Sequence, residues 1–164
     1  MSLPAGPMIT LTVALEGRYT LLPRDGAPRE VAAIDFVTGN HANVLQPGEL
    51  LRNIRLPASA LRKRFASHRS SLTHLGRSAV FLIGTRSADA DDLLLTVTAA
   101  TPRPVQIRFD RAPSSEELRH AIDARIPAEG YFDDVHGSPA YRRRLTYYYA
   151  EQIRAELANS GAAG

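Results

Sequence analysis

The stretch Gly137-Ser138-Pro139-Ala140-Tyr141-Arg142 predicts the start of a long C-terminal helix, the element on which the rest of the fold depends. Ser138 is a good N-cap because its hydroxyl can accept a hydrogen bond from the first turn. Pro139 suits the first helical position, where its missing N–H is of no consequence. We expect the helix to run to about Asn159 and to end by Gly161. Its apolar stripe is expected to comprise Tyr141, Leu145, Tyr148, Tyr149, Ile153 and Leu157.

A shorter helix is predicted just before this one. Ser114-Ser115-Glu116-Glu117 fits a capping box, in which the Ser114 hydroxyl accepts a bond from the first turn and Glu117 reaches back to the cap. Pro127 ends the helix, because a proline cannot continue the helical hydrogen-bond ladder. Its buried face is expected to comprise Leu118, Ala121, Ile122 and Ile126.

Four stretches upstream of these helices predict an antiparallel sheet of three or four strands. Residues 79–84 and 93–99 are nearly continuous apolar runs, and residues 87–92 form a polar connector between them. Residues 105–109 alternate apolar and polar side chains, and residues 61–69 do so more weakly. The second half of the chain is therefore expected to be a sheet packed against the two C-terminal helices.

The first half of the chain predicts shorter antiparallel strands. Residues 9–15 alternate large apolar residues with threonine and alanine, which is typical of a strand with one buried face. Strands over residues 18–22 and 31–36 would complete a short meander, and residues 47–51 predict a single helical turn. The sequence changes character after Pro57. We therefore expect an α+β fold in two parts, residues 8–57 and residues 58–160.

Composition excludes several classes of protein. The chain is 44% hydrophobic and 23% charged, which is typical of a globular domain. It has no cysteine, so disulfides, thiolate catalysis, zinc thiolate sites and iron–sulfur ligation are excluded. No apolar run is long enough to cross a bilayer and the N-terminus does not resemble a signal peptide, so a cytoplasmic location is expected. Met1 to Pro4 is interpreted as an added leader, and the residues after Asn159 as a disordered tail.

The basic residues are almost all arginine. Lys63 is the single lysine among 20 basic residues, and the formal net charge is only +3. Arginine favours fixed pairing with carboxylates and backbone carbonyls. The densest basic run, Arg62-Lys63-Arg64, is interpreted as a solvated strand face rather than a nucleic-acid contact.

Motifs for catalysis and metal binding are missing from the sequence. None of the five histidines forms the i, i+4 pair of a helical metal site, and there is no nucleophile elbow, phosphate-binding glycine loop or dinucleotide fingerprint. Asp133, Asp134 and His136 directly precede the cap of the last helix, where carboxylates favour the positive helix end. The consecutive tyrosines 147–149 are about 100° apart around a helix and cannot form one stacking surface. We therefore predict no catalytic and no metal-binding residue.

Five segments, in this order along the chain, resemble a known family. They are Val13 to Tyr19, Asp35 to Gly39, Leu45 to Pro57, Thr101 to Val105, and Asp133 to Arg142. The last contains a Gly-Ser-x-x-Tyr-Arg motif at the start of the final helix. Together they resemble the FAD-binding medium subunit of the molybdenum hydroxylase family, which includes xanthine dehydrogenase and carbon monoxide dehydrogenase.

The resemblance implies an oxidoreductase role in electron transfer. In that family the subunit transfers electrons from a molybdenum centre, through iron–sulfur clusters on a partner, to FAD. It therefore implies FAD as cofactor, and a molybdopterin-binding large subunit and an iron–sulfur small subunit as partners. The family holds the FAD pyrophosphate in glycine-rich loops, and this chain has none. Residues 8–57 would then be the end of the second FAD subdomain, and residues 58–160 the flavoprotein C-terminal domain. This chain alone is not expected to be catalytic.

Two cofactor-binding residues are implied by the same resemblance. Leu51 corresponds to the family's leucine beside the isoalloxazine ring, although an ordinary core role is an equal alternative. The family often has a lysine four residues before an arginine next to the flavin. If Arg69 is that arginine, the lysine position holds Phe65, and Arg64 is one residue away. Arg64 is therefore the second candidate.

Three functions remain open from the sequence. The first is a scaffold and docking fragment of the FAD-binding electron-transfer subunit. The second is an interaction domain that binds partner oxidoreductase subunits without flavin chemistry. The third, from a different class, is an arginine-rich nucleic-acid-binding domain.

Overall fold

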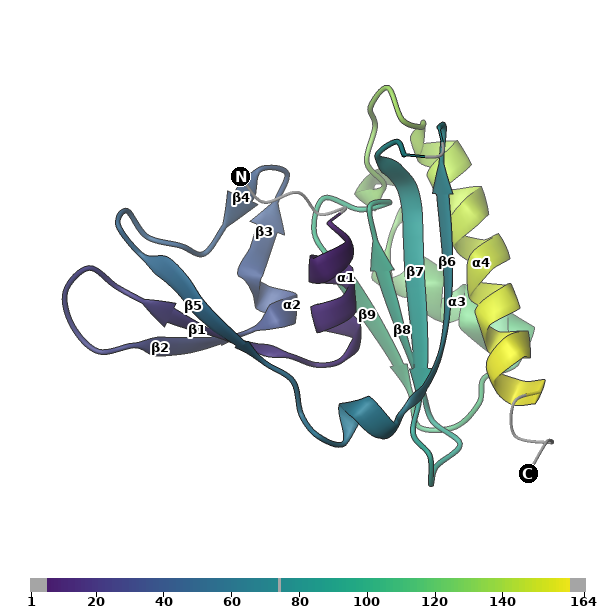
Figure 1. The fold of residues 1–164 in the computed structure, drawn as a ribbon. Coiled ribbons are helices and arrows are strands. Elements are labelled where there is room, and N and C mark those ends of the chain that lie inside the picture. The colour runs from purple at the N-terminus through teal and green to yellow at the C-terminus, as the bar shows by residue number, and fades with distance from the viewer. Residues whose placement is uncertain (1–5, 74, 160–164) are drawn as a thin grey trace.

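A computed structural model describes residues 6–73 and 75–159. The expected leader, His74, the helix end at Gly161 and the expected C-terminal tail lie outside the described residues. The protein has the predicted α+β fold, with a four-stranded antiparallel sheet covered on one face by two C-terminal helices (Figure 1). The strands follow the order β6-β7-β8-β9, with bounds β6 Arg64–Ser71, β7 Ser78–Arg86, β8 Leu93–Thr98 and β9 Val105–Phe109.

The long helix α4 (Pro139–Asn159) covers this sheet with a different face from the predicted one. Tyr141 and Tyr148 of the expected apolar stripe are exposed. The residues that α4 buries are Arg142, Thr146, Ala150, Ile153 and Leu157. The predicted stripe is wrong at these two tyrosines, because Arg142, Thr146 and Ala150 occupy the inner positions of the first half of the helix.

Arg142 fixes the first turn of α4 to the sheet. Its side chain is only 1% exposed. It donates hydrogen bonds to the backbone carbonyls of Ala79, Ala99 and Gly137 and forms an ion pair with Asp134. Asp134 therefore binds this arginine in addition to preceding the helix, a role that its position before the cap did not indicate.

The capping box of α3 (Ser115–Arg125) is confirmed. The Ser114 hydroxyl accepts from the backbone N–H of Glu117 at 3.2 Å, and the Glu117 carboxylate accepts from the backbone N–H of Ser114 at 2.8 Å. The Ser138 hydroxyl accepts from the backbone N–H of Tyr141 at 3.4 Å, a longer bond with no reciprocal partner. The cap of α3 is therefore the stronger of the two.

Ser114→Ala is expected to lower the free energy of unfolding by about 1 kcal/mol, because it leaves a backbone donor of the first turn unpaired. Ser138→Ala is expected to have a smaller effect, since its bond is longer. Chemical denaturation of both variants measures the difference. Equal losses for the two variants would contradict this ranking.

The predicted strand over residues 9–15 is wrong, because these residues form the helix α1 (Pro7–Ala14). Pro7 occupies the first helical turn, which suits a residue without an N–H. The hydroxyl of Thr12 donates to the carbonyl of Met8 at 2.8 Å, so this threonine is accommodated within the helix. The large apolar residues of the alternation therefore do not share one face, because Val13 is buried while Leu11 is exposed.

The remaining elements build a smaller, separate sheet. Its strands are β1 (Arg18–Leu22), β2 (Arg29–Ala32) and β5 (Leu50–Arg55), in the antiparallel order β2-β1-β5. Between them lie α2 (Ala33–Phe36), β3 (Val37–Gly39) and β4 (Ala42–Asn43), and the short 3-10 helices are η1 (Ala60–Arg62) and η2 (Ala128–Gly130). The predicted strand over residues 31–36 thus ends early in a helix, and the predicted strand over residues 61–69 begins only at Arg64. Residues 47–51 form a turn into β5 instead of a helical turn.

Helix α1 connects the three-stranded and the four-stranded sheets. Val13 belongs to the small core beneath β1, while the Thr10 hydroxyl lies 2.8 Å from that of Thr98 in β8. The side-chain amide of Gln106 in β9 donates to the carbonyl of Val13 at 2.8 Å. Figure 1 shows α1 on the face of the large sheet opposite α4. The boundary expected after residue 57 stays a prediction.

Candidate functional site

An apolar groove lies between α1, η1, β6 and β7. Its volume is about 440 Å³. Six of the residues that form it are Met8, Leu11, Leu61, Phe65, Phe81 and Ile83. We call it the α1–β6 groove. Met8 is 62% exposed, Leu61 67% and Phe65 71%, which is unusual for residues of this size that lie together. The groove is therefore a candidate contact site, since exposed apolar side chains that lie together are a feature of docking surfaces.

The single lysine of the chain, Lys63, lines this groove and is paired with a carboxylate. The Lys63 side chain is only 11% exposed, and its Nζ is 2.6 Å from a Glu16 carboxylate oxygen. Partial burial raises the pKa of Glu16, but hydrogen bonds from Lys63 and Arg108 outweigh it and hold the pKa below its ordinary value. The middle residue of the run 62–64 therefore faces inward, and the interpretation of that run as a solvated strand face is wrong for Lys63.

The structure separates the two predicted cofactor-binding residues. Leu51 lies in β5 opposite Leu21 and is exposed, whereas Arg64 begins β6 opposite Arg86 in the other sheet. Side chains alternate across a strand, so Arg64 is on the side of β6 opposite to Phe65, which lines the groove. Both flavin contacts therefore stay predictions, and Phe65 and Ser67 are the residues of β6 that line the groove.

The segment before Leu51 has a structural role that the sequence did not reveal. Gly48 has a φ of +80°, a left-handed conformation that favours glycine. The buried Glu49 carboxylate then accepts two hydrogen bonds from Arg29, at 2.8 and 2.7 Å, and one from the backbone N–H of Gln46 at 3.0 Å. These bonds fix the turn that leads into β5 and so position Leu51.

Glu49 is expected to make stability depend on pH. The hydrogen bonds from Arg29, and then from Gln46, lower the pKa of its carboxyl below the ordinary value of 4.5. A lowered pKa in the folded state means that the contribution is complete above the unfolded pKa and is lost as the pH falls through the folded pKa. The free-energy gap between wild type and Glu49→Gln should therefore narrow on acidification below about pH 4.5.

Urea denaturation at a series of pH values measures this gap. Glu129→Gln serves as the control, because Glu129 is exposed and has no ion pair within the described part of the chain. A Glu49→Gln gap that is constant down to about pH 3 would refute the role of the carboxylate charge.

The described residues do not fit the pyrophosphate of FAD. Binding a pyrophosphate takes a run of backbone N–H groups that glycine lets come close. The sequence has no two adjacent glycines, and the described glycines with positive φ, Gly26, Gly48 and Gly137, lie in three separate turns. The α1–β6 groove is lined mostly by apolar side chains and offers no such run of backbone donors. Within the described residues no cluster of histidine and carboxylate side chains could hold a metal ion.

Known proteins match this chain in three-dimensional structure. No protein-family model and no curated protein sequence matches the chain. Quinoline 2-oxidoreductase from Pseudomonas putida 86 superimposes with a TM-score of 0.75 at 18% identity, over 96% of this chain and 57% of that one. Carbon monoxide dehydrogenase from Hydrogenophaga pseudoflava gives 0.72 at 18% identity, over 92% and 55%. The enzyme from Oligotropha carboxidovorans gives 0.74 at 20%, over 92% and 56%.

The chain shares the fold of these oxidoreductase chains. It spans little more than half of their length. Within residues 6–73 and 75–159, no helix has the length and apolarity that crossing a membrane requires.

Proposed function

We propose that the chain is a scaffold and docking module of the FAD-binding electron-transfer subunit of a molybdenum hydroxylase. The observation that carries the proposal is the fold, which matches oxidoreductase chains over 92–96% of this chain. The resemblance of the segments from Val13 to Arg142 to the FAD-binding subunit supports the finer assignment. The partners would be a molybdopterin-binding large subunit and an iron–sulfur small subunit. The assembly would lie in the cytoplasm.

The groove gives this module a physical role. FAD would supply the electron-accepting ring in the complete subunit, and the polypeptide that supplies its pyrophosphate loops would pack against the α1–β6 groove. Covering Met8, Leu61 and Phe65 removes apolar surface from water, which stabilises the assembly. The chain by itself would be non-catalytic.

One observation favours an interaction domain without flavin chemistry as second candidate. Phe65 lines the groove as an exposed apolar side chain, and it would stand at the family's lysine position if Arg69 is the family's arginine. Both candidates use the same groove, and they differ in whether the assembled complex contains FAD.

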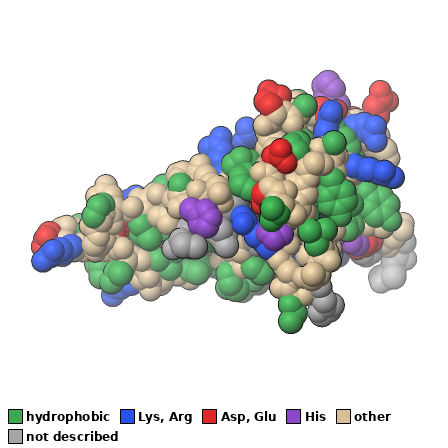
Figure 2. Space-filling model, turned by 90° about the horizontal axis from the view of Figure 1, so that it is seen from above, with side chains coloured by type: hydrophobic (Ala, Val, Ile, Leu, Met, Phe, Trp, Pro, Cys, Tyr) green, Lys and Arg blue, Asp and Glu red, His purple; other side chains and the backbone are tan. Residues whose placement is uncertain are grey.

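Nucleic-acid binding has less support. Acidic and basic side chains are interspersed on the face shown in Figure 2 instead of forming one basic patch. Many arginines are also paired with carboxylates, among them Arg18, Arg29, Arg86, Arg108, Arg111, Arg143 and Arg154. We expect no retardation of DNA or RNA even at low salt, where phosphate contacts are strongest.

The purified chain is expected to be colourless and to bind FAD weakly or not at all, because its described residues offer no pyrophosphate cradle. Absorbance at the flavin bands and a fluorescence titration with FAD measure this. A yellow preparation with stoichiometric FAD would contradict the proposal that the cofactor site needs a further polypeptide.

Isolation of the tagged chain from its source cells tests the assembly. We expect FAD and molybdenum to co-purify in constant ratio to the chain, and Phe65→Asp to abolish both. Val135→Asp is the matched control, because Val135 is 87% exposed and does not line the groove. FAD and molybdenum both missing from the wild-type preparation would refute the electron-transfer role, and molybdenum without FAD would favour the interaction domain.

A further inference from the structure

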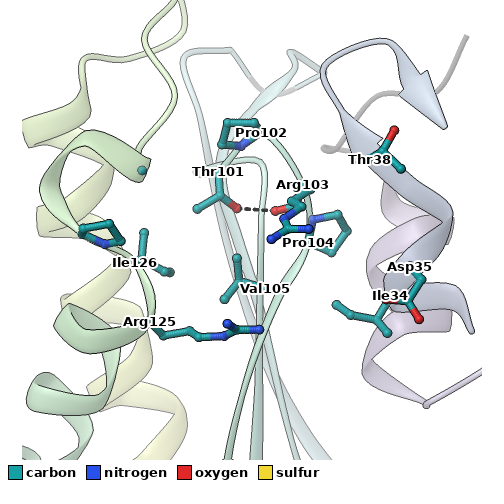
Figure 3. Close-up of a pocket in the computed structure, with 12 residues that line it drawn as sticks. Ile34, Asp35, Thr38, Thr101, Pro102, Arg103, Pro104, Val105, Arg125 and Ile126 are labelled. Carbon is teal, nitrogen blue, oxygen red and sulfur yellow. Dashed lines mark hydrogen bonds between the residues drawn. The ribbon is translucent and has the colours of Figure 1, made fainter.

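A second cleft lies away from the α1–β6 groove and shares none of its lining residues. Helix α2, the loop over residues 101–105 and the end of α3 form it, and its volume is about 330 Å³. Figure 3 shows the side chains of Arg103 and Arg125 in this cleft, on either side of Val105. We call it the Arg103–Arg125 cleft. We propose that it binds a small organic carboxylate, with the carboxylate on the arginines and the apolar body against the cleft wall.

The charge of the cleft supports an anionic ligand. The guanidinium groups of Arg103 and Arg125 have no hydrogen-bond or ion-pair partner among the described residues, in contrast to the many arginines that are paired with carboxylates. A guanidinium presents a planar set of donors that matches a carboxylate in two-point contact. The two groups therefore leave a positive charge in a concave site, where a ligand anion can reach it.

The backbone of the cleft is fixed before any ligand arrives. The Thr101 hydroxyl donates to the carbonyl of Arg103 at 2.7 Å, and Thr101 is itself buried. Pro102 and Pro104 on either side of Arg103 have restricted φ angles. A loop of this kind loses little conformational entropy on binding, which favours affinity.

The walls select for an apolar body. Ile34, Val105 and Ile126 line the cleft, and Ile34 and Val105 face each other across it in Figure 3. Asp35 adds one carboxylate at the side of α2. A second negative charge on the ligand would meet this carboxylate, so a monocarboxylate with a compact hydrocarbon part fits better than a phosphate or a dicarboxylate.

Benzoate and inorganic phosphate are the probes that test this inference. We expect benzoate to shift the amide NMR resonances of residues 34–38 and of Thr101, Arg103 and Val105 in a saturable way at low salt, and phosphate to bind at least about tenfold more weakly. Arg103→Gln and Arg125→Gln should each weaken benzoate about tenfold, which corresponds to the loss of a charged hydrogen bond. Phosphate binding as strong as benzoate would overturn the organic-carboxylate assignment.

Arg52→Gln is the matched control. Arg52 is an exposed arginine of β5 with no ion pair among the described residues, and it does not line the cleft. It should bind benzoate like the wild type. All three arginines are exposed, so each variant should keep the wild-type thermal transition. Unsaturable shifts, or equal weakening in all three variants, would overturn the proposal. The site does not depend on the oxidoreductase role, because neither probe nor readout involves FAD or molybdenum.

Discussion

Arg142→Ala is expected to lower the free energy of unfolding by about 3–5 kcal/mol, the range for removing one partner of a buried ion pair. The guanidinium is almost completely buried and serves four groups at once. Its removal leaves the carbonyls of Ala79 and Ala99 without this donor and Asp134 without its cation. Unpaired buried acceptors retain their desolvation penalty, so the loss exceeds that of an average hydrogen bond.

Two further variants separate this network from a general effect of charge. Arg144→Ala removes a neighbouring exposed arginine and should change stability by less than about 0.5 kcal/mol. Arg142→Lys keeps the charge but cannot place donors on both sheet carbonyls, so it should recover only part of the loss. Chemical denaturation gives all three values. If Arg142→Ala were as mild as Arg144→Ala, the network would have no role in stability.

Local chemistry explains what the sequence could predict. The strand over residues 105–109 and the capping box at Ser114 each depend on a few neighbouring residues, and the structure confirms both. The strand predicted over residues 9–15 was wrong because tertiary contacts outweigh the local alternation: the helix buries Thr10 and Thr12 together with Val13. The side-chain bond of Thr12 to a preceding carbonyl is also not visible in the pattern. The decision there comes from packing against β7 and β8.

The sequence could not predict the tertiary features, because they depend on residues from separate elements. Arg142 belongs to a recognised motif, yet its burial depends on carbonyls contributed by β7 and the residue after β8. The α1–β6 groove brings Met8, Leu61 and Phe65 together from three separate elements. The available signal was the apolar Phe65 on the face of β6 opposite the core residue Ala66. A pattern of this kind indicates an exposed apolar residue but does not say what lies beside it.

Gly84→Ala is expected to destabilise the protein by about 1–3 kcal/mol through overpacking. Gly84 lies in the middle of β7, paired with Ala66 on one side and Leu95 on the other, directly beneath α4. An added Cβ would overlap Cγ2 of Ile153 and come within 3.2 Å of a methyl of Leu157. Ile153 is β-branched and held in a helix, so it cannot rotate away easily. Helix α4 would have to move off the sheet.

A double-mutant cycle shows whether the overlap with Ile153 is the cause. Ile153→Ala alone should cost about 2–5 kcal/mol by creating a cavity. Combined with Gly84→Ala it should cost less than the sum of the two single variants, because the new methyl enters the space that Ile153 vacates. Gly39→Ala is the control, since its Cβ would meet only the Cβ of Ala42 at 3.8 Å. Additive losses for the pair would mean that Gly84 matters for its backbone and not for the close approach of α4.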